Sequence, residues 1–146
     1  QTLFADFELQ FHEHAEAGNP LTAEWLNAKY KELIELYYGP EFAMGENDEC
    51  EWMFIPHFFY NFYVFTYATG LTSGIAMAER IDEMGDKAAQ QYIDGMLKAG
   101  SSAPPLDILR DAGVDLETPA PIQSAMDLFA ETVEEFEETW VKANKQ

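Results

Sequence analysis

A histidine and three tyrosines occur at helical spacing in the middle of the chain, and their side chains could bind a polar substrate. On a helix of about 100° per residue, with the histidine set at zero, the tyrosines fall at about 300°, 240° and 280°. The residues concerned are His57, Tyr60, Tyr63 and Tyr67. Buried phenols need hydrogen-bond partners, so such a stripe suits the wall of a cleft, where hydroxyls can stabilise the charge that develops on a carbonyl oxygen. The spacing leaves a second interpretation open, in which the stripe hydrogen-bonds to neighbouring helices.

Aromatic rings without polar atoms fall on the other side of the same predicted helix. They lie between about 80° and 200° on the wheel and belong to Phe58, Phe59, Phe62 and Phe65. We expect this helix to begin at Pro56, because proline at the first helical position loses no backbone hydrogen bond. An Ala-rich stretch that ends in "AERIDEMG" comes after it. The helix thus separates its imidazole and phenols from its plain rings.

The same stretch carries no formal charge from Trp52 to Ala78, which is long enough for a bilayer span of roughly 20 residues. His57, Asn61 and the hydroxyl groups argue against a span, and so do the acidic rather than basic flanks. We therefore expect no membrane partner.

Helices separated by breakers are predicted on both sides of this stretch. The first has a face made of Leu3, Phe4, Phe7, Phe11 and His14, and it ends at Gly18-Asn19-Pro20. The second is capped by Thr22 and ends at Gly39-Pro40, with Trp25, Leu33, Ile34 and Tyr37 on its buried side. Residues two apart on a helix do not face each other, so His12 and His14 are predicted to be surface histidines that cannot share an ion.

Three more helices are predicted after the uncharged stretch. One runs from Asp86 to about Lys98, a short one is closed by Gly113, and the last starts near Pro121. The last helix carries an apolar stripe that we expect to pack against neighbours, made of Ile122, Met126, Phe129, Val133, Phe136 and Trp140. No strand-like alternation is sustained, so the predicted fold class is all-α with several helices.

Composition limits the possible partners and the compartment. The chain has 146 residues, enough for one domain or one piece of a larger one. Its 27 acidic and 8 basic residues give a net charge of -19, which repels nucleic acid. Cys50 is the only cysteine, which excludes an internal disulfide and fits a cytoplasmic protein. The chain opens inside an amphipathic run, so we expect Gln1 to be a cut end within a helix.

Four stretches, in order along nearly the whole chain, resemble the oligoendopeptidase F family of zinc peptidases, relatives of thimet oligopeptidase. They are "QTLFADFELQFHEHAEAG", "LTAEWLNAKYKELIELYYG", "EWMFIPHFFYNFYVFTYATGLTSGIAMAERI" and "YIDGMLKAGSSAPPLDILRDAGVDLETPAPI". The resemblance implies a mostly helical catalytic domain in which a His-Glu-x-x-His helix and a later Glu bind zinc. The metal-bound water is then the nucleophile, and short peptides are the substrates.

The resemblance also implies roles for the aromatic stripe. In the thimet branch two tyrosines seven apart follow a histidine, and Tyr60 and Tyr67 reproduce that interval. Tyr67 and Tyr60 are then the hydroxyl donors to the oxyanion, and His57 orients the peptide. His57, Tyr60 and Tyr63 are the residues expected to bind the substrate. The loop at Gly100, Ser101 and Ser102 resembles a family loop near the cleft, although a plain helix-ending turn explains it equally well.

The sequence departs from the family pattern in two respects: His57 precedes Tyr60 by three residues rather than five, and the chain contains no His-Glu-x-x-His motif. We therefore expect residues 1–146 to be the C-terminal portion of a peptidase catalytic domain. Zinc would be bound by residues upstream of this chain, and this segment would bind no zinc. The segment alone should therefore be inactive. Its expected partners are a short peptide and the upstream remainder of the domain. The alternative is a non-catalytic helical packing or interaction module.

Overall fold

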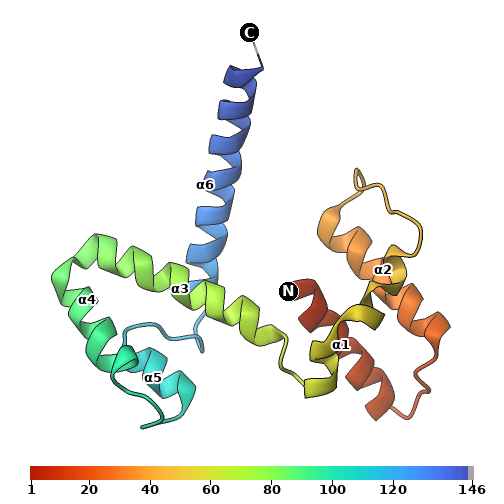
Figure 1. Ribbon diagram of the computed structural model, residues 1–146, viewed down its shortest axis with the longest axis horizontal. Helices are drawn as coiled ribbons and strands as arrows, with labels where there is room; N and C mark the ends of the chain where they lie inside the picture. The colour runs from red at the N-terminus through yellow and green to blue at the C-terminus, as the bar shows by residue number, and fades with distance from the viewer. Residues whose placement is uncertain (145–146) are drawn as a thin grey trace. The chain divides into compact units, whose positions relative to one another are not determined.

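The computed structural model describes residues 1–144 and consists of helices joined by turns (Figure 1). The chain divides into two compact units, Gln1–Ala68 and Thr69–Gln146, with the boundary inside α3. Among the described residues no strand occurs, which confirms the all-α prediction.

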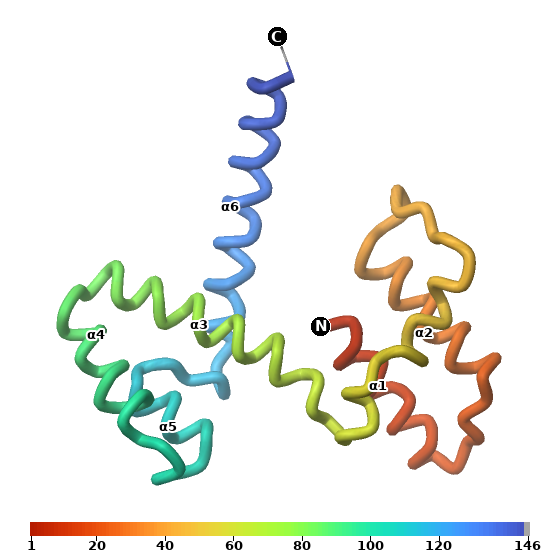
Figure 2. Tube along the Cα trace, in the orientation of Figure 1, coloured from red at the N-terminus to blue at the C-terminus, as the bar shows by residue number. Residues whose placement is uncertain are grey.

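The elements follow one another with short connections, as the trace shows (Figure 2). The first unit holds α1 (Thr2–Glu16), α2 (Ala23–Tyr38), the 3-10 helices η1 (Asp48–Phe54) and η2 (Pro56–Tyr60), and the start of α3 (Phe65–Met84). The second unit holds the rest of α3, α4 (Asp86–Tyr92), the π-helical turn η3 (Ile93–Leu97), α5 (Pro105–Asp111) and α6 (Ala120–Ala143). The predicted breakers therefore lie where the helices end.

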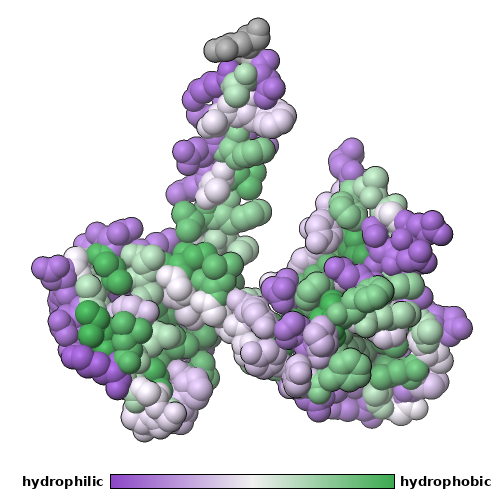
Figure 3. All heavy atoms as spheres, in the orientation of Figure 1, coloured by the Kyte–Doolittle hydropathy of each residue, from purple (hydrophilic) through white to green (hydrophobic). Residues whose placement is uncertain are grey.

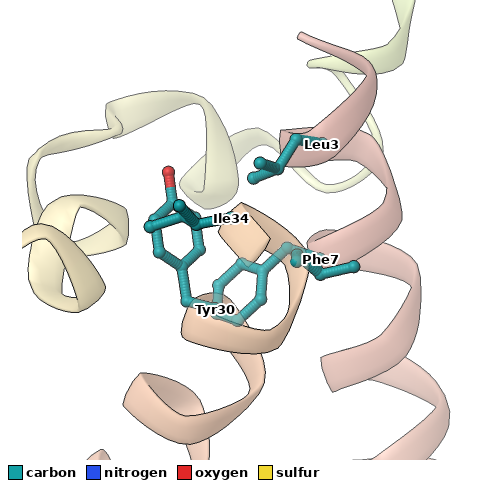
Figure 4. Packing of buried hydrophobic residues seen from close by; sticks show 5 residues of the cluster. Leu3, Phe7, Tyr30 and Ile34 are labelled. Atoms are coloured by element: carbon teal, nitrogen blue, oxygen red, sulfur yellow. The ribbon is translucent and has the colours of Figure 1, made fainter. Parts of the chain in front are cut away.

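The core of the first unit forms where α1 and α2 pack together. Leu3 and Phe7 of α1 face Tyr30 and Ile34 of α2 (Figure 4). The rings of Phe7 and Tyr30 meet edge to face, with centroids 5.0 Å apart at 83°, a favourable arrangement for aromatic pairs. Both side chains are fully buried. The predicted apolar face of the first helix is thus the face that packs.

The start of α2 confirms one prediction, and its end corrects another. The Thr22 hydroxyl accepts a hydrogen bond from the Trp25 backbone N–H at 3.2 Å, as expected for an N-cap. Tyr37, expected to be buried, is exposed instead. Its hydroxyl donates to a carboxylate oxygen of Asp6 at 3.2 Å, so a polar contact with α1 takes the place of core packing.

The core of the second unit brings α3 together with the segment after α5. Ala76 and Met77 of α3 pack against Ala112 and Val114. Gly113, between them, has a φ of +100°, and a Cβ there would lie 2.5 Å from the Arg80 guanidinium. The backbone conformation therefore favours glycine here, and a side chain would also displace the Arg80 guanidinium.

The apolar stripe of α6 is exposed, which corrects the expectation that it packs against neighbours. Figure 3 shows apolar side chains along one side of this helix and polar ones along the other. Only Pro121 and Ala125 of α6 are buried, because its contacts within the described part of the unit are made near its first turns. The exposed residues of the stripe are Ile122, Met126, Phe129, Val133, Phe136 and Trp140.

None of the described helices combines the length and the apolar content that a bilayer crossing requires. The uncharged stretch from Trp52 to Ala78 does not form one helix, since it is divided among η1, η2 and α3.

Candidate functional site

The predicted continuous helix from Pro56 is interrupted in the structure. The 3-10 helix η2 ends at Tyr60, and α3 begins only at Phe65. Between them Asn61 and Phe62 have positive φ angles of 33° and 54°. The Phe62 backbone N–H donates to the Glu8 carboxylate at 2.7 Å, so a side chain of α1 takes this donor in place of a helical carbonyl. The chain turns sharply here (Figure 2), and the helical-wheel angles do not describe the site.

The turn nevertheless brings the predicted polar side chains together. His57 Nε2 and the Tyr67 hydroxyl oxygen lie 3.0 Å apart, within hydrogen-bond distance. The Tyr63 ring stacks on His57, with centroids 5.9 Å apart and planes 5° from parallel. Tyr67 meets both rings edge to face, at 5.2 Å from His57 and 5.8 Å from Tyr63. Tyr60 joins the group through Tyr63, whose ring it meets edge to face at 6.0 Å. We call these four residues the His57 cluster.

Buried residues on both sides of the turn hold the cluster in place. Ile55 precedes η2 and Val64 precedes α3, and both are buried, Val64 completely. The Tyr67 backbone N–H donates to the Val64 carbonyl at 3.2 Å. Phe58, next to His57, packs its ring against Phe7 of α1 at 5.6 Å. The cluster is thus attached to the α1–α2 core by apolar side chains on either side of it.

The phenols of the cluster remain open to solvent. Tyr60 is 66% exposed, Tyr63 46% and Tyr67 44%, so their hydroxyls are not sealed in apolar packing. Partial burial raises the pKa of the Tyr67 hydroxyl, and the neighbouring Tyr63 hydroxyl raises it further. Because the ordinary pKa of tyrosine is about 10, Tyr67 is protonated at neutral pH. It is therefore available as a neutral hydrogen-bond donor.

The helical wheel suggested that the plain rings of this stretch share one environment, but the structure places them in different ones. Phe58 packs into the core, whereas Phe59 is 85% exposed. Both rings line an apolar pocket of about 300 Å³, together with Phe11, Trp52 and Met53. Neither His57 nor any tyrosine lines this pocket. It is a feature separate from the His57 cluster.

The two N-terminal histidines are not plain surface residues, which corrects the prediction. His14 stacks on Trp25 with ring centroids 3.9 Å apart. The His12 ring is tilted by 35° against the Phe62 ring, with centroids 4.5 Å apart, and its buried Nε2 has no hydrogen-bond partner among residues 1–144. Half-burial in an aromatic environment explains both positions. In residues 1–144, moreover, no three His, Cys, Asp or Glu side chains are grouped as a metal site requires.

Gly100, Ser101 and Ser102 form a turn in the second unit, with Gly100 at a φ of +55°, and their role near a cleft stays a prediction.

Glu8, which the sequence reasoning did not select, is 1% exposed, and its carboxylate accepts a hydrogen bond from the backbone of the turn at the site. A signal existed, because Glu8 lies four residues after Phe4 and three before Phe11, on the apolar side of the helix.

Comparison with known proteins gives consistent matches along this chain. The model of peptidase family M3 matches residues 1–128. Oligopeptidase PepF of Bacillus subtilis (strain 168) is 43% identical over 145 residues, which are 99% of this chain and 22% of that protein. An oligoendopeptidase F homolog of Lactococcus lactis subsp. lactis is 45% identical over 139 residues, which are 94% of this chain and 23% of that protein.

Solved structures agree with these sequence matches. The crystal structure of oligoendopeptidase-F from Enterococcus faecium superposes with a TM-score of 0.90 at 40% identity. The superposition covers 97% of this chain and 27% of that one. This chain therefore spans about a quarter of the length of the relatives it matches.

Proposed function

Because this chain belongs to peptidase family M3, we propose that it forms the part of a zinc-dependent oligoendopeptidase that holds a short peptide at the reacting bond. Tyr67 and Tyr60 are the hydroxyl donors to the oxyanion, and His57 orients the peptide. Tyr63 supports the His57 ring and contributes to substrate binding. The observation that carries the proposal is the 3.0 Å contact between His57 and Tyr67, formed between two solvent-accessible side chains across an interrupted helix.

The direction of the hydrogen bond between His57 and Tyr67 decides what the pair can do. If Nε2 carries a proton, it donates to the Tyr67 oxygen and leaves the hydroxyl proton free for a substrate oxygen. In the other tautomer Tyr67 donates to the ring, and its proton is used within the protein. We propose the first arrangement during turnover.

The ring contacts around His57 restrict how the imidazole can turn. Tyr63 lies parallel to the imidazole, and Tyr67 meets it edge to face. A ring held from two sides presents its nitrogens in fixed directions, which lowers the entropy lost when a peptide is bound. Tyr60, the most exposed phenol of the cluster, can reach a peptide without displacing either neighbour. These contacts support the division of roles proposed above.

The zinc of the family does not fit the residues of this chain. The described histidines are engaged in three different aromatic environments, and no group of ligand side chains suitable for a metal forms in residues 1–144. We propose that the metal is bound by a part of the complete protein outside this chain, as the resemblance implies. The role of the His57 cluster is to bind and orient the peptide and to donate hydrogen bonds.

The proposal is tested by removing one hydroxyl in the complete protein. Tyr67→Phe should lower kcat for an internally quenched short peptide by roughly 10² or more, with a smaller change in KM. Tyr38→Phe is the matched control, because Tyr38 is an exposed phenol of the same unit that stacks on Phe42 rather than on the cluster. An unchanged kcat/KM in Tyr67→Phe removes the assigned role.

One observation favours a second candidate function, a non-catalytic packing or interaction module. The stripe of α6 exposes large apolar side chains, as a surface that binds another helix does. The two candidates differ in what the complete protein does, since only the first requires the His57 cluster for turnover. The 146-residue chain alone should not cleave peptides under the first proposal. Metal-dependent cleavage by the purified chain would contradict that assignment.

A further inference from the structure

The backbone between η2 and α3 adopts a conformation that side chains disfavour. Asn61 and Phe62 both have positive φ angles, 33° and 54°. Positive φ is uncommon outside glycine, and for a bulky residue such as phenylalanine it is a genuine outlier. Such a conformation persists only where surrounding contacts impose it. The turn therefore needs an interaction that holds it.

Glu8 of α1 supplies that interaction. Its carboxylate accepts the Phe62 backbone N–H at 2.7 Å, between residues 54 apart in the sequence. Glu8 is only 1% exposed, and acidic side chains are almost never buried without a specific partner. Its neighbour Phe7 is fully buried in the α1–α2 core, so the helix that presents the carboxylate is itself fixed.

Other contacts between α1 and the turn have the same effect. The Phe62 ring lies over His12, one helical turn beyond Glu8, with centroids 4.5 Å apart at 35°. On the other side of the turn, Phe58 packs on Phe7 and Phe11 of α1 at 5.6 and 5.8 Å. The apolar contacts place the turn near α1, and the Glu8 hydrogen bond selects the direction of the Phe62 amide.

The turn that Glu8 holds separates the two partners of the cluster. His57 lies on η2 before it and Tyr67 lies on α3 after it. The 3.0 Å distance between His57 Nε2 and the Tyr67 oxygen therefore depends on the backbone angles of Asn61 and Phe62. We propose that Glu8 is a positioning residue, whose buried carboxylate fixes the turn at Asn61–Phe62 and so brings Tyr67 to His57. This inference rests on the proposed role of the cluster, but its geometric part can be measured separately.

The test uses substitutions of Glu8 in the complete protein, with peptide cleavage as the first readout. Glu8→Gln keeps an acceptor oxygen at the same reach and should retain kcat within about threefold, because a neutral acceptor still bonds the amide. Glu8→Leu removes the acceptor and should lower kcat by roughly 10- to 100-fold, with KM little changed, since small misplacements of reacting groups have effects of this size. Glu8→Asp keeps the charge but has a shorter side chain, so its kcat should be lower than that of Glu8→Gln. Glu13→Leu, on the exposed side of the same helix, is the control and should behave as the wild type.

The ordering of the variants decides the outcome even if Glu8→Leu does not fold. Activity of Glu8→Asp equal to or above that of Glu8→Gln would mean that charge rather than reach matters, and it would overturn the proposal. Wild-type kcat in a folded Glu8→Leu variant would overturn it too.

Hydrogen exchange separates this inference from the proposed function. Exchange of the peptide containing the Phe62 amide should become faster in Glu8→Asp and in folded Glu8→Leu, but not in Glu8→Gln or Glu13→Leu. If exchange follows this order while Tyr67→Phe retains full activity, the positioning geometry stands and the assigned role of the cluster fails. If exchange is unchanged in every variant, Glu8 does not hold the turn and the inference is wrong.

Discussion

The contact between His57 and Tyr67 makes a quantitative prediction for a double-mutant cycle in the complete protein. The variants are His57→Ala, Tyr67→Phe and the combination of both. The contact is 3.0 Å long and lies at a partly exposed site, where Tyr67 is 44% exposed. A hydrogen bond of this kind contributes about 0.5–1.5 kcal/mol net. The two substitutions should therefore be coupled, with an interaction free energy of that size.

The expected losses of activity follow from the two roles of the Tyr67 hydroxyl, as oxyanion donor and as hydrogen-bond partner of His57. Loss of an oxyanion donor lowers kcat by roughly 10²- to 10³-fold. Loss of the hydrogen bond to His57 is included in that effect, so it must not be counted twice in the double variant. The double variant should then be about 2- to 12-fold more active than the product of the single losses predicts.

The assay is steady-state cleavage of an internally quenched peptide, with kcat and KM determined separately for each variant. A fall in kcat with a small change in KM indicates an interaction made mainly in the transition state. Tyr38→Phe, an exposed phenol outside the cluster, controls for the loss of a hydroxyl. Strictly additive losses would show that the two side chains act independently, and the reasoning from their contact would be refuted.

Three other predictions concern stability and association. The pKa of Tyr30 is raised, mainly by burial, so this phenol stays protonated in the folded state at a pH where the unfolded chain loses the proton. Its contribution to stability is complete below pH about 10, and above that pH the free energy of unfolding should fall by about 1.4 kcal/mol per pH unit. Urea titrations of Tyr30→Phe should lack this part of the fall. Phe7 is fully buried, so Phe7→Ala should lower the free energy of unfolding by about 3–5 kcal/mol and lower Tm, and a loss under about 1 kcal/mol would contradict the described core. Phe129 and Phe136 are exposed on the α6 stripe, so sedimentation should show that the isolated chain self-associates. The double variant Phe129→Glu with Phe136→Glu should reduce this self-association, whereas the control Glu135→Gln should not. A monomeric wild-type chain would contradict the prediction.

The sequence predicted most helices because their signals are local. The breakers at Gly18-Asn19-Pro20 and Gly39-Pro40 and the cap at Thr22 act on the backbone next to them. The face of Leu3 and Phe7 follows from helical periodicity. Such features do not depend on distant parts of the chain, so the predicted and observed elements agree there.

The interruption after Tyr60 could not be predicted in the same way. No glycine or proline occurs from Asn61 to Val64, and the positive φ of Phe62 is imposed by Glu8, which lies 54 residues earlier. A tertiary hydrogen bond of this kind leaves no local signal. The predicted grouping of His57 with the tyrosines is found in the structure, although the sharp turn and not a continuous helical stripe produces it.

The α6 stripe shows a different limit of the sequence argument. Its periodicity predicts which side of the helix is apolar, and the structure agrees on that side (Figure 3). Periodicity does not say what covers the side. In the described residues Phe129 and Phe136 are exposed, so the expectation of packing fails while the expectation of an amphipathic helix holds.

The most direct test of the account is a crystal structure of the complete protein with a bound phosphinic peptide, whose tetrahedral phosphorus carries an anionic oxygen. We predict that the Tyr67 hydroxyl donates to that oxygen at about 2.7–3.1 Å, with the His57 ring still in contact with Tyr67 and the peptide lying along the same side. A bound inhibitor that leaves both the Tyr60 and Tyr67 hydroxyls beyond hydrogen-bond distance, or a complete protein that seals them inside apolar packing, would contradict the assignment of this cluster to substrate binding.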